Sequence, residues 1–114
     1  MSGTLALAPR EQAPTETRNH GVDFTGKLKE LSGDPLLTGT PTVTVSPSGP
    51  TLSNKQVSTI ATVINDNEVD IAKAVLFTCT GGTDGVDYTI TVTCGTTSSP
   101  AETLVGTLTL KVRV

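Results

Sequence analysis

The segment Lys73–Val92, KAVLFTCTGGTDGVDYTITV, is the part of the chain that decides how the rest is interpreted. Apolar side chains alternate with polar ones, mostly Thr, on both sides of a loop rich in Gly and Asp. Alternation with a period of two, bounded by Gly and Asp, is typical of half-buried β-strands. The pattern therefore predicts one strand over Ala74–Thr80 and a second strand over Asp87–Val92.

The connection between these two strands is predicted to be a corner rather than a hairpin. A tyrosine at the start of a strand that follows a sheet-to-sheet corner can hydrogen-bond its hydroxyl group back to the preceding loop. Tyr88 stands at this position, just after the turn that contains Gly85. We therefore expect Gly85 and Tyr88 to form a structural corner, with Tyr88 as an interior clasp.

The composition predicts one small domain and gives no indication of nucleic-acid binding, membrane insertion or secretion. A chain of 114 residues that is 35% hydrophobic, with two Phe, one Tyr and no Trp, predicts a single thin core of Val, Leu and Ile. The net charge of −3 gives no basic footprint for nucleic acid. No apolar run reaches the length of a membrane span. The first residues lack the basic region and the apolar core of a secretory signal, so we expect no Sec export.

The two cysteines, Cys79 and Cys94, are predicted to be free thiols. Cys79 is expected beside the corner, whereas Cys94 lies beyond Tyr88 by roughly 20 Å of strand. A disulfide requires Cα atoms within about 7 Å of each other. Both side chains face inward by parity, which predicts two buried thiols and is consistent with a reducing compartment.

Residues 1–20, MSGTLALAPREQAPTETRNH, differ from the rest of the chain because they contain two prolines and no sustained period. They predict an extended N-terminal arm rather than a packed element. Two interpretations stay open, namely a disordered tail and an arm that orders against a neighbouring subunit. In the second interpretation Leu5 and Leu7 are apolar anchors, and Arg10 and Arg18 complete the candidate partner-binding arm.

Residues 21–114 predict a succession of strands separated by turns rich in Gly, Pro, Ser and Asn. Besides the central pair, strands are expected over Gly21–Leu31, Thr40–Val45, Val57–Ile64 and Thr103–Val114. Residues 52–56 are expected to form a polar loop, or alternatively a short helical turn. Strands at intervals of about ten residues, with no helix-length pattern between them, predict an all-β Greek-key β-sandwich of about seven strands.

No group of side chains predicts catalysis or metal binding. His20 is the single histidine and is expected to be exposed in the arm, where it completes neither a triad nor a metal site. Asp66, Glu68 and Asp70 offer oxygen atoms at alternate positions, but the Gly and the later Glu of a calcium loop are absent. A solvated turn is favoured there. Gly81–Gly82 is not followed by a helix, which argues against a phosphate loop. We therefore expect no enzyme activity, no cofactor and no metal.

From Gly33 onward the order of segments resembles small tailed-bacteriophage virion proteins of the fibre–tail adaptor kind. These proteins share an SGGT-x-G-x-x-Y-T-[VI]-T core. Here Thr80 replaces the Ser, and residues 81–91 fit the rest. The order then closes with the sequence Leu-Lys-Val-Arg-Val. The resemblance covers about three quarters of the chain and implies an immunoglobulin-like sandwich. The long arm over residues 1–20 departs from the family pattern.

The resemblance also implies a structural role, in which many copies form a ring that joins the tail or neck to tail fibres. The implied partners are other tail, neck or portal-proximal proteins and the tail fibre, with no nucleic acid and no membrane. The implied location is the virion, after assembly in the host cytoplasm. An exposed strand edge such as Thr40–Val45 is a plausible place for pairing with another subunit.

A capsid decoration protein or a carbohydrate-binding surface module of the same fold is the alternative function. Sugar-binding sites usually contain exposed aromatic side chains that stack on the sugar. This chain has no Trp, and its single Tyr is expected to be buried. The composition therefore favours the adaptor.

Overall fold

The computed structural model describes residues 10–31, 33, 35–64, 67–98 and 100–113. Within these residues the chain forms nine strands and one short helix. In chain order they are β1 (Arg10–Gln12), β2 (Thr17–Asp23), α1 (Thr25–Lys29), β3 (Leu37–Ser46), β4 (Thr51–Val57), β5 (Thr62–Ile64), β6 (Asn67–Val69), β7 (Ala74–Thr80), β8 (Asp87–Thr96) and β9 (Thr103–Val112).

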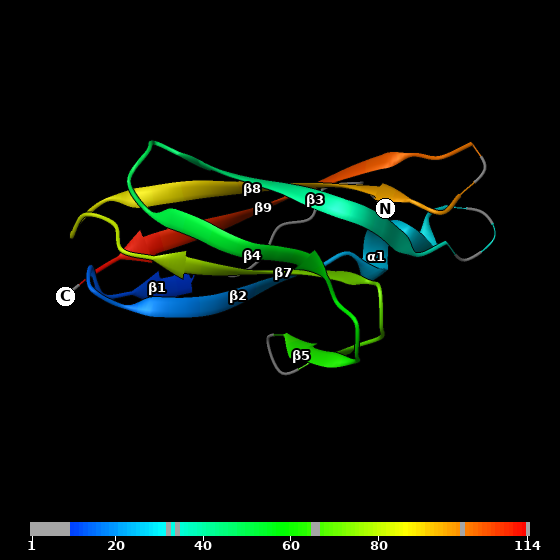
Figure 1. Ribbon diagram of the computed structural model, residues 1–114, viewed down its shortest axis with the longest axis horizontal. Helices are drawn as coiled ribbons and strands as arrows, with labels where there is room; N and C mark the ends of the chain where they lie inside the picture. The colour runs from blue at the N-terminus through cyan, green and yellow to red at the C-terminus, as the bar shows by residue number, and fades with distance from the viewer. Residues whose placement is uncertain (1–9, 32, 34, 65–66, 99, 114) are drawn as a thin grey trace.

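Seven of these strands make two sheets that pack face to face (Figure 1). The first sheet has the strand order β1-β9-β8-β3, and the second has the order β2-β7-β4. β1 pairs with β9 in parallel, and the other neighbouring strands of the two sheets are antiparallel. The described part of the chain is therefore an all-β, sandwich-like protein, which confirms this part of the prediction.

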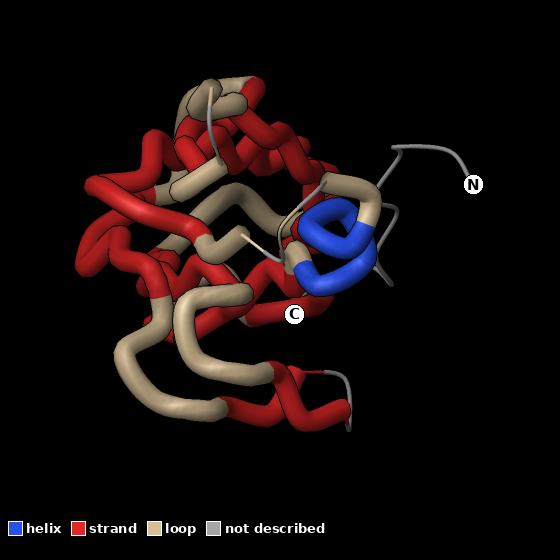
Figure 2. The backbone as a smooth tube through the Cα atoms, turned by 90° about the vertical axis from the view of Figure 1, so that its right-hand side faces the viewer, coloured by secondary structure: helices blue, strands red, loops and turns tan. Residues whose placement is uncertain are grey.

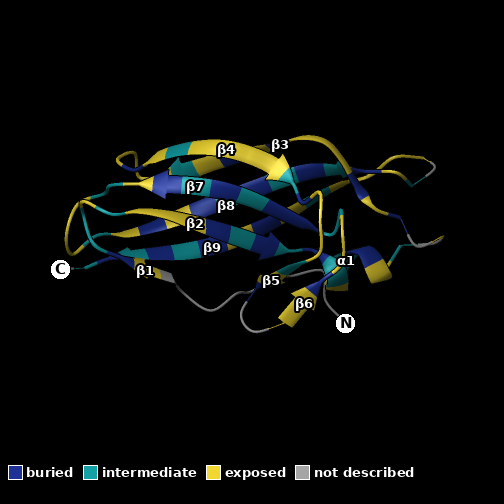
Figure 3. Ribbon diagram, turned by 60° about the horizontal axis from the view of Figure 1, so that its bottom comes forward, coloured by how far each residue is buried: buried dark blue, intermediate teal, exposed yellow. Residues whose placement is uncertain are grey.

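One hydrophobic core fills the space between the two sheets, and its buried residues lie along the inner strands (Figure 3). The predicted inward faces are confirmed for Val75, Phe77 and Cys79 on β7 and for Tyr88, Ile90 and Val92 on β8. Because β7 and β8 belong to different sheets, residues 81–86 cross from one sheet to the other. The connection is therefore the predicted corner and not a hairpin.

β5 and β6 form a separate two-stranded hairpin. It stands apart from the main strands on the side of the β2-β7-β4 sheet, as the end-on view shows (Figure 2). Ile64, Val69 and Ala74 form a small second core there, with Leu76 packed against it. The sequence predicted a polar turn over Asn65–Asp70, whereas residues 67–69 pair with β5 as a strand.

The predicted first strand over Gly21–Leu31 is wrong after Asp23, because α1 follows. Phe24 and Leu28 are both buried, and their spacing of four places them on one face of a helix. The Thr25 backbone N–H donates to the Asp23 carboxylate at 2.8 Å, which starts the turn. Val22 and Phe24 keep the alternation of a strand, whereas Leu28 follows Phe24 at the spacing of a helix.

The predicted strand boundaries between residues 51 and 64 are also wrong. β4 covers residues 52–56, for which a loop or a helical turn was predicted. Of the predicted strand Val57–Ile64, Val57 is the last residue of β4, Thr62–Ile64 is β5, and the residues between them are not in a strand. β4 lies at the edge of its sheet, and its side chains are mostly exposed and polar. No apolar alternation marks such a strand, so the sequence pattern missed it.

Residues 10–20 are not an extended arm, which corrects the prediction made for residues 1–20. Arg10–Gln12 pairs with β9, and Thr17–Asp23 pairs with β7 over its whole length. The backbone hydrogen bonds of these strands come from partners far along the chain, so local sequence shows little of them. Residues 1–9 lie outside the described residues.

The remaining strand predictions agree with the structure. The predicted strand Thr40–Val45 lies within β3, which is at the edge of its sheet as expected. The last predicted strand, Thr103–Val114, begins at Thr103 like β9, but β9 ends at Val112, and Val114 lies outside the described residues. Both cysteines are free and buried, as predicted.

Candidate functional site

The corner between β7 and β8 is closed by the hydroxyl group of Tyr88. The Thr83 backbone N–H donates to the Tyr88 Oη at 2.9 Å, and Tyr88 is only 2% exposed. Gly82 lies beside the ring, and a Cβ atom at this position would lie 2.6 Å from Val112 Cγ2. Gly85 has a φ of +87°, and its N–H donates to the Val112 carbonyl at 2.8 Å. The residues expected at the corner therefore lie in the same turn, and the Tyr88 hydroxyl group bonds back to the loop.

The structure describes only part of the predicted partner-binding arm. Leu5 and Leu7 lie outside the described residues, and Arg10 is the first residue of β1. Arg18 lies on β2, where its guanidinium group is 3.6 Å from the Glu16 carboxylate. Both of these side chains are about half exposed, so the ion pair contributes little to stability.

His20 is buried, which corrects the expectation that it is exposed. Its Nε2 atom lies 3.0 Å from Gln12 Oε1, and its ring centroid lies 5.7 Å from that of Phe77. The Gln12 Nε2 donates to the carbonyl groups of Glu16 and Gly81. Because the amide oxygen of Gln12 can only accept, the His20 Nε2 carries the proton in this hydrogen bond. His20 therefore helps to join β1 to β2.

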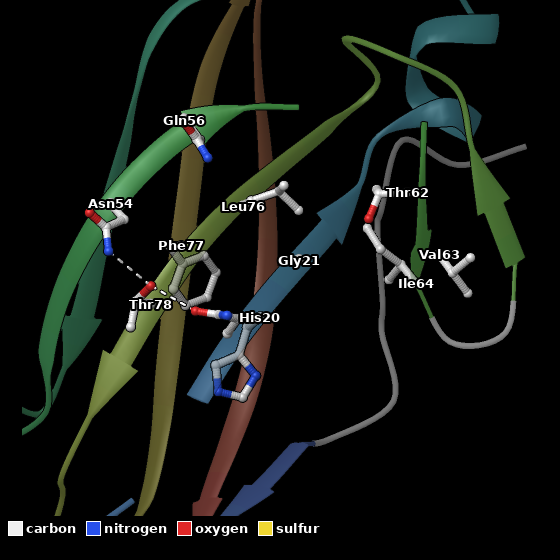
Figure 4. A pocket seen from close by; sticks show the side chains of 11 residues that line it. His20, Gly21, Asn54, Gln56, Thr62, Val63, Ile64, Leu76, Phe77 and Thr78 are labelled. Atoms are coloured by element: carbon white, nitrogen blue, oxygen red, sulfur yellow. Dashed lines mark hydrogen bonds between the residues drawn. The ribbon is translucent and has the colours of Figure 1, made fainter. Parts of the chain in front are cut away.

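A groove of about 480 Å³ lies between the β5–β6 hairpin and the outer face of the β2-β7-β4 sheet (Figure 4). It is lined by residues 19–21 of β2, 54 and 56 of β4, 62–64 of β5 and 76–78 of β7. None of these residues is Asp, Glu, Lys or Arg. The groove can therefore hold an uncharged group without leaving a charged side chain unpaired.

Polar side chains cross one part of this groove, and apolar ones line another (Figure 4). The Asn54 side-chain amide donates to Thr78 Oγ1 at 3.2 Å, and Thr78 Oγ1 donates to Asn19 Oδ1 at 2.8 Å. Gly21 leaves room for Ile64, because a Cβ atom at Gly21 would lie 2.8 Å from Ile64 Cδ1. This groove was missed from the sequence because the hairpin that walls it was not predicted.

A second surface feature, which we call the apolar patch, consists of Leu36, Ile60 and Ile71. These side chains are 37%, 70% and 53% exposed and line a shallow hollow. They lie in the segments before β3, between β4 and β5, and between β6 and β7, so they gather at the end of the sandwich that carries α1. Exposed apolar side chains that gather in one place are typical of protein–protein contact sites.

Neither the cysteines nor the acidic residues form a reactive centre in the described residues. Burial raises the pKa of the Cys79 and Cys94 thiols above the ordinary value of 9.0, so both are protonated at neutral pH. Across the described residues no three His, Cys, Asp or Glu side chains are grouped so that they could hold a metal ion. Glu68 and Asp70 are exposed, and Asp66 lies outside the described residues.

Among the described residues no helix is long and apolar enough to cross a membrane. No protein-family model, curated protein or solved structure matches this chain.

Proposed function

We propose that this protein is a structural virion protein of a tailed bacteriophage, an adaptor that joins the tail or neck to tail fibres. Many copies form a ring, and each copy contacts other tail, neck or portal-proximal proteins and the fibre. The observation that carries the proposal is the adaptor-type motif over Thr80–Thr91, whose Tyr88 closes the corner by its hydrogen bond to Thr83. The protein acts through surfaces rather than through catalysis.

We further propose that the sandwich has immunoglobulin-like topology. In that fold one sheet contains strands B, E and D as neighbours, and the other contains C, F and G. The orders β2-β7-β4 and β3-β8-β9 fit these two sets in chain order. Tyr88 is the second residue of β8, which corresponds to strand F, where such sandwiches place a tyrosine corner. These correspondences support the finer fold assignment.

The apolar patch supports a role in protein–protein contact. Ile60 and Ile71 are more than half exposed, and burying them against a neighbour would remove apolar surface from water. In the proposed ring we assign this end of the sandwich to contacts with the neighbouring virion protein. The net charge of −3 is consistent with protein partners rather than nucleic acid.

The test is the presence and the position of the protein in purified phage particles. We expect quantitative mass spectrometry to detect it in many copies per particle, and electron microscopy with a specific antibody to label the tail or neck. Labelling over the whole capsid would instead indicate a decoration protein. Absence of the protein from purified particles would refute the virion assignment.

A variant pair then tests the contact surface. We expect Ile60→Asp to reduce incorporation into particles at least tenfold, because it places a charge in the proposed contact, while the free energy of unfolding changes by less than about 0.5 kcal/mol. Val105→Asp is the matched control, since Val105 is 43% exposed and lies on β9 outside the patch. Equal incorporation of both variants would contradict the role of the apolar patch.

A carbohydrate-binding surface module is the second candidate, and the groove favours it. The amide groups of Asn19, Asn54 and Gln56 and the hydroxyl group of Thr78 offer neutral hydrogen-bonding partners of the kind that bind sugar hydroxyls. Against this function, the groove has no exposed aromatic side chain for stacking. Specific binding to a glycan array that is lost in Asn54→Ala would favour the module over the adaptor.

A further inference from the structure

Asp84 and Gly85, within the corner between β7 and β8, form the single place in the chain where an Asp or Asn precedes a Gly. Such a pair is chemically labile, because Gly has no side chain that shields its backbone nitrogen from the neighbouring carboxyl group. The other Asp and Asn residues are followed by larger residues, as Asp87 is by Tyr88. Asp84 is exposed, so water reaches it.

The reaction at this pair is an isomerisation that needs only water. The Gly85 backbone nitrogen attacks the Asp84 Cγ atom and forms a C–N bond, while the carboxyl OH leaves with the amide proton as one water molecule. The product is a five-membered succinimide ring. A water molecule then opens the ring. If it breaks the bond between the nitrogen and the main-chain carbonyl carbon, the chain afterwards runs through Cγ, and the residue is isoaspartate.

The structure holds Asp84 in a conformation that opposes the first step. The Val86 N–H donates to the Thr83 carbonyl at 3.1 Å, which closes a four-residue turn with Asp84 and Gly85 at its centre. Gly85 has a φ of +87°, whereas Asp84 is not among the described non-Gly residues with positive φ, and this combination defines a type II turn. Ring closure requires the Asp84 Cβ atom to eclipse the Gly85 nitrogen, whereas a type II turn holds Cβ roughly a third of a rotation away.

Hydrogen bonds around the turn also oppose the reaction. The Gly85 N–H donates to the Val112 carbonyl at 2.8 Å, so the attacking nitrogen is already in a hydrogen bond. The Val112 N–H donates to the Val86 carbonyl at 3.2 Å. The Thr83 N–H donates to the Tyr88 Oη at 2.9 Å. A backbone rotation toward the ring geometry breaks the first of these bonds, so attack requires that the corner opens locally.

We propose that Asp84–Gly85 is a latent modification site, where isoaspartate forms only when the corner opens and then prevents the corner from closing. The new linkage lengthens the main chain by one carbon atom between the two Cα atoms. The four-residue turn and the hydrogen bond from Gly85 to Val112 then cannot form together. Each converted molecule therefore keeps a covalent record of having opened at this corner. This inference does not depend on the proposed function.

The rate of isoaspartate formation in the full-length protein tests the site. Samples are kept at neutral pH and digested at intervals, and isoaspartate is measured by mass spectrometry after labelling with an isoaspartyl methyltransferase. We expect the folded protein to convert at least about tenfold more slowly than the same chain unfolded in guanidinium chloride, because only opened molecules react. Asp84→Glu should abolish the signal, since the longer side chain does not close the five-membered ring. Equal rates in the folded and unfolded protein would overturn the proposal.

A variant pair tests the role of the corner. Tyr88→Phe removes the acceptor of the Thr83 N–H, and we expect it to raise the rate in the folded protein about fivefold, the factor that corresponds to one lost hydrogen bond. Thr89→Ser, at the exposed neighbouring position, is the matched control and should leave the rate unchanged. Equal rates in these two variants would contradict the dependence on corner opening.

A further measurement does not depend on any variant. The isoaspartate form that accumulates in an aged sample is separated by chromatography, and its amide hydrogen exchange is compared with that of the unmodified protein by NMR. We expect the amides of Thr83 and Gly85 to exchange at least about tenfold faster in the isoaspartate form, while those of Ile90 and Val92 on β8 stay protected. Unchanged protection at Gly85 would show that the corner closes around isoaspartate, and this result would also overturn the proposal.

Discussion

Tyr88 illustrates how a single hydroxyl group can hold a connection between two sheets. Its ring fills the core, and its Oη accepts from the Thr83 backbone N–H at 2.9 Å. Tyr88→Phe keeps the ring and removes the acceptor, so we expect the free energy of unfolding to fall by about 1 kcal/mol. Chemical denaturation measures this change. Thr89→Ser, at the exposed neighbouring position, should change it by less than about 0.5 kcal/mol.

Two glycines of the same corner allow the stability cost of backbone strain to be distinguished from the cost of steric crowding. Gly82 and Gly85 both have positive φ values, but a Cβ atom at Gly82 would lie 2.6 Å from Val112 Cγ2, whereas one at Gly85 would have no neighbour within 4 Å. We expect Gly85→Ala to destabilise by about 1 kcal/mol through its backbone alone. Gly82→Ala should cost distinctly more in thermal or chemical denaturation. Equal losses would show that the corner relaxes around the added methyl group.

The two buried thiols predict a pH dependence at the alkaline end. Burial raises the pKa of Cys79 and Cys94 in the folded state, so above pH 9 the unfolded thiols ionise while the folded ones stay protonated. Their contribution to stability is therefore complete below pH 9 and is lost as the pH rises through the folded pKa. Denaturation curves between pH 7 and about 10.5 should show this decline. The double variant C79A/C94A should show a shallower decline.

At the scale of elements, the β5–β6 hairpin is held to the sheet by a small core of its own. Ile64 is 8% exposed and packs against Leu76, whereas the adjacent Val63 is 67% exposed. We expect Ile64→Ala to destabilise by about 2 kcal/mol, at the low end for a buried Ile because one side of the site is near the surface. Val63→Ala should cost less than about 0.5 kcal/mol.

Hydrogen exchange shows where the loss in Ile64→Ala occurs. The amides of β5 and β6 should exchange faster, while those of β8 stay protected. A uniform loss of protection in all strands would mean that the hairpin and the main sandwich unfold as one unit.

The elements that could be predicted from the sequence are those in which apolar and polar residues alternate in a way that only a strand explains. β7 has the predicted bounds, and β8 begins at Asp87 as predicted but continues to Thr96, beyond the predicted end at Val92. α1 was missed because this five-residue helix buries only Leu28, which lies four residues after the buried Phe24 that precedes the helix. β4 was missed because an exposed edge strand needs no apolar side chains. The corner of the candidate site was foreseen from Tyr88, whereas the groove depends on pairing between β5 and β6, which the local pattern does not show.

At the scale of the whole molecule, Gln12 joins segments from three parts of the chain. Its side chain bonds to His20 of β2 and to the backbone carbonyls of Glu16 and Gly81. We expect Gln12→Ala to lower the free energy of unfolding by about 1–3 kcal/mol, because buried polar groups lose these partners. Glu11→Ala, at the exposed neighbouring position, should have little effect in the same denaturation experiment.

The parallel pairing of β1 with β9 has a mechanical consequence. Arg10 begins β1 opposite Leu110, and Val112 ends β9 opposite Gln12. Tension applied between Arg10 and Val112 pulls these parallel strands lengthwise past each other, so their hydrogen bonds bear the load together rather than one after another. In single-molecule pulling between these positions, we expect a higher unfolding force than for pulling across the β5–β6 hairpin, whose antiparallel strands would peel apart from their open end.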